Sequence, residues 1–238
     1  MTVKAARKTK AGGRLAATEA VALLEPGRLE YEASERLQKR LVEKVRARPA
    51  RGYLVLLEHP PTVTLGRGSH AENLLLAPEE IERRGIRMVE CRRGGDVTYH
   101  GPGQLVGYPI LRLARPDLHG YLRALEETLV RTLADFGVEA GREKGLTGVW
   151  TGMGKIAAIG VAVTSRLVTY HGFALNVTSD PAAAGVIVPC GIADRPVTSL
   201  AEVLGREPDA AEVRDAVVRR FGEVFGVEVS RARTGELE

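Results

Sequence analysis

The chain has 238 residues, enough for one large domain whose core is stable without disulfide bonds or a structural metal. A composition of 44% hydrophobic and 27% charged residues is typical of a globular protein, and it excludes disordered, collagen-like and coiled-coil chains. The net charge is only +4, no segment is long and apolar enough to span a membrane, and two cysteines are too few for a secreted disulfide scaffold. We therefore expect a cytoplasmic protein.

The basic charge is concentrated at the N-terminus. Five basic residues precede the first acidic residue, Glu19: Lys4, Arg7, Lys8, Lys10 and Arg14. A segment of this kind is typical of a transit peptide, a nucleic-acid-binding arm or a solvated tail, and the lack of an apolar stretch favours the tail. We expect residues 1–18 to be a flexible basic tail and residues 19–238 a single domain, with neither nucleic acid nor membranes as partners.

Hydrophobic spacing predicts one helix and three strands in the first half of the chain. Leu37, Leu41 and Val45 recur at helical intervals and predict an amphipathic helix over residues 29–45. Three apolar segments predict strands: Tyr53–Leu57, Ile86–Glu90 and Gln104–Leu113. Since Pro109 cannot donate a hydrogen bond to a neighbouring strand, we expect the third strand to lie at a sheet edge or to contain a bulge.

In the second half of the chain, the predicted strands and helices alternate less regularly. Asp117 is the predicted N-cap of a helix that ends before Gly137, and Ser199 with Glu202 has the spacing of a capping box. The remaining predicted elements are a strand hairpin and a final helix: Lys155–Val163 with Leu167–Val177, and Asp209–Phe225. Strands and helices without strict alternation predict an α/β fold of the α+β type, a single domain with a central mixed sheet.

Three glycine-rich segments, residues 92–104, 147–160 and 189–191, mark places where the backbone turns sharply or approaches a ligand. The second segment contains neither of two common nucleotide motifs. Val149 and Ile156 stand where a phosphate loop requires Gly and Ser or Thr. Asn176 stands where a dinucleotide-binding motif requires an acidic residue.

Reactive side chains accompany these glycines. Cys190 follows a proline and precedes a glycine, so it is either a turn nucleophile or a small buried residue. Lys155 lies among apolar residues and is either the cation that activates a thiol or a strand-end lysine that reaches solvent. His100 and His171 are candidate bases or structural histidines. No histidine or cysteine pair has metal-ligand spacing, and we expect neither a metal nor another cofactor.

Four segments together carry a family resemblance: Arg93–Gln104, Gly154–Ala157, His171–Asn176 and Pro189–Gly191. They closely resemble the signature of the octanoyltransferases of lipoate biosynthesis, over about residues 20–205. The resemblance implies a fold similar to the catalytic domain of biotin and lipoate protein ligases. It also implies transfer of an octanoyl or lipoyl group from acyl carrier protein to a lysine of lipoyl domains, in 2-oxoacid dehydrogenases and the glycine cleavage H protein.

The resemblance assigns functions to individual residues. It implies that Cys190 carries the acyl group as a thioester, that Lys155 assists it, and that neither ATP nor a cofactor is needed. The substrate pocket that it implies comprises fourteen residues: Arg93, Gly94, Gly95, Asp96, Val97, Thr98, Tyr99, His100, Ala158, Ile159, Gly160, Gly172, Phe173 and Ala174. The expected enzyme is a monomer.

Three other functions are consistent with parts of the sequence. An ATP-dependent lipoate or biotin ligase shares the arginine–glycine segment and the lysine, but it needs no cysteine nucleophile. A carrier-binding module without activity and a cysteine hydrolase are the other two. Since acyl carrier and lipoyl proteins are generally acidic, we expect exposed arginines such as Arg67, Arg92 and Arg142 to steer their docking.

Overall fold

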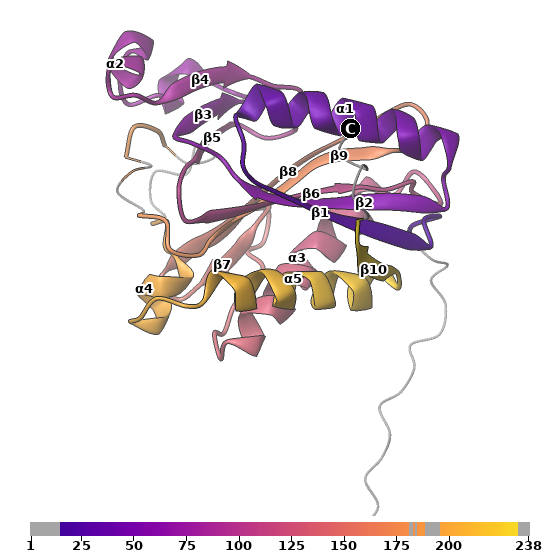
Figure 1. The fold of residues 1–238 in the computed structure, drawn as a ribbon. Helices are drawn as coiled ribbons and strands as arrows, with labels where there is room; N and C mark the ends of the chain where they lie inside the picture. Colours follow the sequence, from indigo (N-terminus) through magenta and orange to yellow (C-terminus); the bar gives the residue numbers. More distant parts are fainter. Residues whose placement is uncertain (1–14, 181–182, 184, 189–195, 233–238) are drawn as a thin grey trace, which may run out of the picture.

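The computed structural model describes residues 15–180, 183, 185–188 and 196–232. Its centre is a seven-stranded mixed sheet in the order β10-β1-β2-β6-β9-β8-β7 (Figure 1). The first three strands in this order are parallel, and the pairs from β2 to β7 are antiparallel. The strands are β1 (Ala20–Arg28), β2 (Arg51–Glu58), β6 (Gln104–Ile110), β7 (Val149–Thr151), β8 (Gly154–Val163), β9 (Thr169–Asn176) and β10 (Glu228–Arg231).

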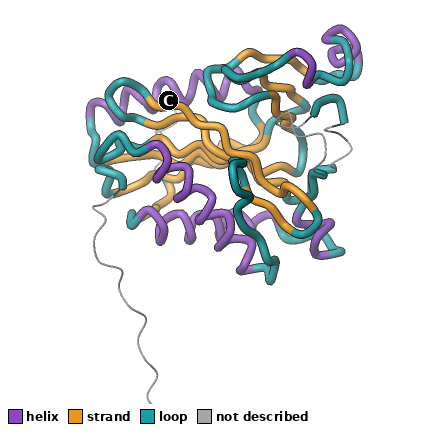
Figure 2. The backbone as a smooth tube through the Cα atoms, turned by 180° about the vertical axis from the view of Figure 1, so that it is seen from behind, coloured by secondary structure: helices purple, strands orange, loops and turns teal. Residues whose placement is uncertain are grey.

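A second sheet of three strands lies beside the main one. It contains β3 (Thr62–Leu65), β4 (Arg87–Glu90) and β5 (Val97–His100) in the order β4-β3-β5. The 3-10 helix η1 (Ala71–Asn73) and helix α2 (Pro78–Arg83) connect its strands. The small sheet has its own apolar core, which includes Val63, Ile81 and Val97. It lies on the same side of the main sheet as α1, as the two opposite views show (Figures 1 and 2).

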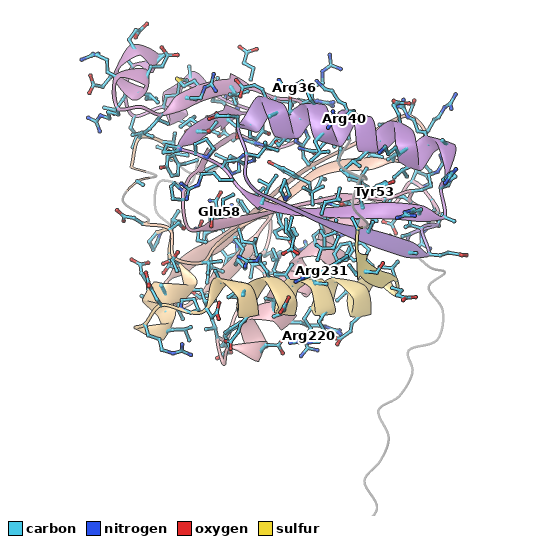
Figure 3. The ribbon with its side chains drawn as sticks, in the orientation of Figure 1. Arg36, Arg40, Tyr53, Glu58, Arg220 and Arg231 are labelled. Atoms are coloured by element: carbon cyan, nitrogen blue, oxygen red, sulfur yellow. The ribbon has the colours of Figure 1, made fainter. Side chains whose placement is uncertain are left out.

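Helices cover both faces of the main sheet. Helix α1 (Tyr31–Ala47) packs Leu37, Leu41 and Val45 on one face, which confirms the predicted helix. Its exposed residues Arg36 and Arg40 point outward (Figure 3). Helices α3 (Leu118–Asp135) and α5 (Ala210–Phe225) cover the other face (Figure 1).

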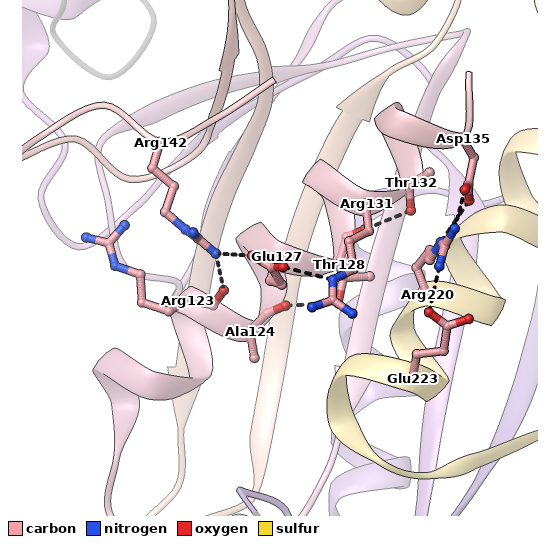
Figure 4. Close-up of polar contacts among 10 residues, drawn as sticks. All are labelled: Arg123, Ala124, Glu127, Thr128, Arg131, Thr132, Asp135, Arg142, Arg220 and Glu223. Atoms are coloured by element: carbon pink, nitrogen blue, oxygen red, sulfur yellow. Dashed lines mark hydrogen bonds and ion pairs between the residues drawn. The ribbon is translucent and has the colours of Figure 1, made fainter. Parts of the chain in front are cut away.

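An ion pair and aromatic packing join the two helices on this second face. The Arg220 guanidinium of α5 donates to the Asp135 carboxylate at the end of α3, at 2.9 Å for its Nε (Figure 4). This contact holds the pKa of Asp135 below its usual range. The ring of Tyr121, near the start of α3, contacts that of Phe225 with centroids 5.9 Å apart. In the described part of the chain, no helix has the length and apolar character to cross a membrane.

Helices α3 and α4 begin at the capping residues that the sequence predicted. The Asp117 carboxylate accepts a hydrogen bond from the Gly120 N–H at 2.8 Å and so caps α3. Ser199 and Glu202 form the predicted capping box of α4 (Leu200–Leu204), which ends at Gly205 with φ of 66°. Each interaction satisfies backbone groups that have no partner within the helix.

The prediction that the strand with Pro109 lies at a sheet edge or contains a bulge is wrong. Strand β6 lies between β2 and β9, and it pairs with β2 in continuous register from Val106 to Ile110. The proline is tolerated there since the continuous β6–β9 pairing runs only to Gly107 opposite Phe173. Beyond that point no ladder bond to β9 is needed from Pro109. Its carbonyl instead accepts a hydrogen bond from the Thr169 hydroxyl at 2.8 Å.

The body of the domain begins before residue 19, where the sequence placed the boundary. Ala16 and Thr18 are fully buried. Ala16 forms a bridge to Leu113, and the Thr18 hydroxyl accepts a hydrogen bond from the Arg112 N–H at 3.0 Å. Residues 1–14 of the predicted tail lie outside the described residues.

We predict that Gly107→Ala lowers the free energy of unfolding by about 1–3 kcal/mol, the usual cost of overpacking. The added Cβ would lie 2.1 Å from the ring of Phe173 on the neighbouring strand. Gly141→Ala is the matched control because nothing lies within 4 Å of its Cβ position. Urea unfolding measures both variants, and equal stabilities would contradict the close packing described for β6 and β9.

Candidate active site

A narrow cavity of about 40 Å³ lies where the main sheet, the small sheet and the start of α1 meet. Most of the pocket residues predicted from the sequence line it. These twelve are Arg93, Gly94, Gly95, Asp96, Thr98, His100, Ala158, Ile159, Gly160, Gly172, Phe173 and Ala174. Three separate segments of the chain therefore converge, as the motifs indicated.

Two of the fourteen predicted pocket residues, Val97 and Tyr99, do not line this cavity. Side chains alternate along a strand, so Thr98 and His100 of β5 face the cavity while Val97 and Tyr99 face the opposite side. Val97 is fully buried in the core of the small sheet, and Tyr99 packs against that core.

Four lining residues were missed as pocket residues in the sequence: Tyr31, Val106, Tyr108 and His171. Tyr31 begins α1 and Tyr108 lies within β6, so both follow the periodicity of ordinary core residues. Only long-range packing brings them to the cavity. Of these four residues, only His171 had a signal in the sequence: it was a candidate base, and it directly precedes the predicted pocket residue Gly172.

Arg93 forms part of the cavity wall from a buried position. Its guanidinium donates to the hydroxyl and the carbonyl oxygen of Thr64 at 2.7 and 2.8 Å, and to the Gly94 carbonyl at 3.1 Å. The Gly94 N–H donates to the Val161 carbonyl of β8 at 2.9 Å. These bonds attach the arginine–glycine segment to both sheets.

Asp96 stabilises the loop rather than the cavity. Its carboxylate accepts hydrogen bonds from the backbone N–H groups of Val97 and His70, at 2.7 and 3.1 Å. The side-chain amide of Asn73 donates to the other carboxylate oxygen. The described contacts therefore give the Asp96 side chain a structural function in this loop.

The histidines around the cavity are neutral. Burial lowers the pKa of His59. It lowers the pKa of His100 well below its usual range and that of His171 to about 3. The positive charge of Arg93 also opposes protonation of His100 and His171. The Gln104 amide nitrogen donates to Asn176, so its oxygen faces His100 and accepts from the Nδ1–H at 2.7 Å. The assigned network leaves Nε2 of His100 as a hydrogen-bond acceptor. No three His, Cys, Asp or Glu side chains are grouped to hold a metal within the residues that the structure describes.

Lys155 lies near the start of β8, three residues before Ala158 of the cavity wall, and its side chain is only 5% exposed. Its ammonium lies 5.2 Å from the centre of the Trp150 ring, within the range of a cation–π interaction. Its backbone N–H donates to the Pro196 carbonyl at 2.9 Å, and its carbonyl accepts from the Thr198 N–H at 3.0 Å. The chain that follows the third glycine-rich segment is thus paired directly with this lysine.

A buried carboxylate on α3 positions the loop around Lys155. The Glu126 side chain is 2% exposed, forms ion pairs with Arg123 and Arg142 at 2.7 and 2.9 Å, and accepts from the Gly148 N–H at 3.3 Å. Gly148 packs so closely that a Cβ there would lie 2.8 Å from Cε of Lys155. The packing of the lysine therefore depends on α3.

Arg142, which was expected to steer docking, is exposed and forms ion pairs with carboxylates of α3. Besides Glu126, it donates to the Glu127 carboxylate at 2.8 Å and to the Arg123 carbonyl at 3.1 Å (Figure 4). Arg67 and Arg92 are exposed, as a docking function requires.

Cys190 lies outside the described residues. Its described flanks are Val188, whose N–H donates to the Asn73 carbonyl at 2.8 Å, and Pro196, which pairs with Lys155.

Comparison with known proteins identifies close similarities over most of the chain. The model of the lipoyl protein ligase A/B catalytic domain matches residues 30–222. The octanoyltransferase of Geobacter metallireducens is 53% identical over 197 residues, which cover 82% of this chain and 89% of the relative. The octanoyltransferase of Solibacter usitatus is 50% identical over 205 residues, covering 85% and 92%.

The fold is shared with a more distant protein. A crystal structure of lipoate-protein ligase A bound with ATP superposes with a TM-score of 0.72 and covers 92% of this chain and 90% of that one. At 19% sequence identity this likeness concerns the fold alone. It confirms the predicted mixed-sheet architecture of the lipoate ligase type.

We predict that Gly148→Ala displaces Lys155 from the Trp150 ring. Its Cβ would also lie 2.6 Å from the Ala157 carbonyl, and φ of +129° is unfavourable for a side chain. Trp150 is the only tryptophan, so its fluorescence emission should shift. Gly152→Ala is the control, since nothing lies within 4 Å of its Cβ position. Identical emission spectra of the wild type and Gly148→Ala would contradict the described packing.

We predict that His171 makes the protein less stable in acid. Above its usual pKa of about 6.5 the ring is neutral in both folded and unfolded states, so stability is complete. As the pH falls from 6.5 toward 3, the unfolded chain binds a proton that the folded chain does not. The free energy of unfolding should then fall by up to about 1.4 kcal/mol per pH unit from this residue.

His171→Asn tests this pH dependence because asparagine tolerates the left-handed backbone found at residue 171. Urea unfolding between pH 7 and pH 4.5 should give a shallower slope for the variant than for the wild type. Parallel slopes would show that the ring is protonated in the folded protein.

Proposed function

Because the chain belongs to the octanoyltransferases and contains the lipoyl protein ligase A/B catalytic domain, we propose that it transfers octanoyl, or lipoyl, groups from acyl carrier protein to lipoyl domains. As an octanoyltransferase it is an acyltransferase that acts in lipoate metabolism. The proposed acceptors are lysines of the lipoyl domains of 2-oxoacid dehydrogenases and of the glycine cleavage H protein. The proposed reaction needs no ATP and no cofactor, and a monomer in the cytoplasm carries it out.

The observation that supports this function best is a buried lysine paired with the chain that carries a cysteine. Lys155 is enclosed by Trp150 and Gly148, and its backbone pairs with Pro196 and Thr198. Cys190 is six residues before Pro196 and two after Val188, which is bonded to the loop that carries Asn73. An ammonium beside a thiol lowers the pKa of the thiol and increases the fraction of reactive thiolate.

In the first proposed step the Cys190 thiolate attacks the carbonyl carbon of the octanoyl thioester. A new carbon–sulfur bond forms to Cys190 and the carbon–sulfur bond to the carrier breaks. The departing carrier thiolate takes a proton from the Lys155 ammonium, so the carrier leaves as the thiol and Lys155 becomes a neutral amine. One thioester replaces another, so the step is nearly balanced in free energy and needs no ATP. The ammonium of Lys155 supplies the positive charge that stabilises the attacking thiolate.

In the second step the amine of the acceptor lysine attacks the acyl-enzyme. An amide bond forms, the bond to Cys190 breaks, and the neutral amine of Lys155 takes the proton that the acceptor loses. Formation of the amide makes this step favourable.

The cavity suits an alkyl chain. Ala158, Ile159, Phe173 and Ala174 supply apolar contacts. Burial of each methylene of the chain contributes roughly 0.8 kcal/mol. Neutral histidines keep this pocket free of added charge. The pocket therefore provides binding energy for an apolar donor group, while the guanidinium of Arg93 in its wall is hydrogen-bonded to Thr64 and Gly94.

We predict that mixing the protein with octanoyl-acyl carrier protein, without ATP, gives an octanoyl adduct on Cys190. Intact mass spectrometry and peptide mapping detect the adduct, which should clear when a lipoyl domain is added. Cys190→Ser should abolish the adduct and lower transfer at least about a thousandfold, as loss of a nucleophile does. Lys155→Ala should slow formation of the adduct. Cys91→Ser is the matched control and should form it normally.

The outcomes separate the alternatives. Transfer that requires ATP and proceeds through no adduct would identify an adenylate-forming ligase. Transfer that survives Cys190→Ser would retain the function and refute the covalent mechanism. Binding of the carrier without transfer, under all conditions, would identify a binding module.

A further inference from the structure

Two of the four signature segments end at residues that the candidate substrate pocket does not use. Gln104 ends the first segment and Asn176 ends the third, and neither is among the described residues that line the cavity. Gln104 begins β6 and Asn176 ends β9, where the register of these antiparallel strands places them opposite each other. Since the pocket does not account for the two side chains, their contacts beyond it are informative.

The two side chains form a continuous chain of hydrogen bonds. The Gln104 amide nitrogen donates to the Asn176 side-chain oxygen at 2.9 Å, and the Asn176 nitrogen donates to the Thr198 carbonyl at 3.0 Å. At the other end of the chain, the Gln104 oxygen accepts from Nδ1 of His100 in the pocket wall. Hydrogen bonds therefore connect the wall of the pocket with the segment that contains Thr198.

Two backbone carbonyls fix the orientation of both amides. The Gln104 nitrogen also donates to the Tyr99 carbonyl at 3.2 Å, so both of its hydrogens are used. A carbonyl only accepts, so the Asn176 atom that faces Thr198 must be the nitrogen and the atom that faces Gln104 must be the oxygen. Asn176 is thus held in the one orientation in which it can bind the Thr198 carbonyl.

The carbonyl that Asn176 binds belongs to a residue that pairs with Lys155. The Thr198 N–H donates to the Lys155 carbonyl at 3.0 Å, and the Lys155 N–H donates to the Pro196 carbonyl at 2.9 Å. These two bonds form an isolated parallel bridge between Lys155 and Val197. Thr198 is 1% exposed, so its carbonyl needs a partner within the protein. Asn176 is that partner, and it stabilises the bridge.

Residues 196–198 are the C-terminal anchor of the segment that carries Cys190, which lies six residues before Pro196 in the sequence. Two side chains hold this anchor from different directions. From α4, the Glu202 carboxylate accepts from the Thr198 hydroxyl at 2.8 Å. From the main sheet, Asn176 donates to the Thr198 carbonyl. The contact from the main sheet fixes the anchor relative to β8, the strand of Lys155.

We propose that Asn176 is a positioning residue of the transfer reaction, which holds residues 196–198 against Lys155 and so fixes the end of the segment that brings Cys190 to this lysine. This inference rests on the proposed octanoyl transfer. Asn176 acts through Thr198 and touches neither the acyl chain nor the reacting atoms. Its loss therefore slows acylation of the cysteine and leaves the affinity for the acyl donor unchanged.

The test begins with Asn176→Ala, which removes both hydrogen bonds of this side chain. Single-turnover mass spectrometry with octanoyl-acyl carrier protein follows the adduct on Cys190. The maximal rate constant of acylation should fall at least about tenfold, since a small misplacement of a reacting group can cost about a hundredfold. The donor concentration that gives half of this rate should stay within about twofold of the wild-type value, because a transition-state effect leaves donor binding unchanged.

Alkylation of Cys190 by iodoacetamide gives a readout that a general loss of stability would not move. The thiolate is the form that reacts, so the pH at which alkylation reaches half of its maximal rate reports the pKa of the thiol. This pH should be higher in Asn176→Ala than in the wild type, as it should be in Lys155→Ala, because the thiol is then not held beside the ammonium. Cys91 in the same samples is the internal reference, and its alkylation should be unchanged.

Thr18→Val is the matched control, because it removes side-chain hydrogen bonds of another buried residue. The Thr18 hydroxyl donates to the Pro49 carbonyl at 3.3 Å and accepts from the Arg112 N–H at 3.0 Å, beyond the end of β6 opposite to Gln104. This variant should be less stable but should acylate at the wild-type rate. An equal loss of rate in this control would overturn the proposal. So would an unchanged acylation rate in Asn176→Ala, or a rise in the half-saturating donor concentration alone.

If Asn176→Ala does not fold, Asn176→Asp replaces it, since a carboxylate still accepts from Gln104 but cannot donate to the Thr198 carbonyl. Its acylation rate should fall as well, and a wild-type rate would overturn the proposal. A wild-type protein that forms no octanoyl adduct is a different result, because it refutes the proposed cysteine–lysine reaction itself.

Discussion

The site depends on direct contact between backbones that only glycine allows. A Cβ on Gly172 would lie 2.1 Å from the Gly107 carbonyl, and one on Gly160 would lie 2.9 Å from the Gly94 carbonyl. Both distances are too short for a side-chain carbon, so β6, β8, β9 and the arginine–glycine segment approach as closely as main chains can. The narrow pocket lies where these segments meet, and the buried residues Arg93 and His171 both line it.

Local signals in the sequence predicted the elements well because their causes are local. The Asp117 cap, the Ser199–Glu202 capping box and the spacing of Leu37 and Leu41 each depend on residues within about one helical turn. The position of Pro109 could not be predicted in the same way. Its strand is central because β6 also pairs with β9, whose residues lie sixty or more positions away in the sequence.

The pocket residues, too, divide into those that local sequence predicts and those that only long-range packing determines. Glycine-rich segments were visible in the sequence, and twelve of fourteen predicted residues line one cavity. Side chains alternate between the two faces of β5, which explains why Val97 and Tyr99 do not line the cavity. Tyr31 and Tyr108 could not be recognised, since nothing in their local sequence distinguishes a residue that lines a cavity from one in the core. Lys155 was recognisable as a lysine among apolar residues, whereas its dependence on Glu126 of α3 became visible only in the structure.

The segment between Val188 and Pro196 joins two anchor points on different sheets. Val188 is bonded to Asn73 beside the small sheet, and Pro196 to Lys155 at the start of β8. For a proposed nucleophile at Cys190, the number of residues on each side of it then matters as much as their identity. Loss or gain of one residue would change the number of residues available to bring Cys190 to Lys155, although both residues would still be present in the sequence. Evolution of this enzyme should therefore tolerate substitutions in the segment far more readily than insertions and deletions.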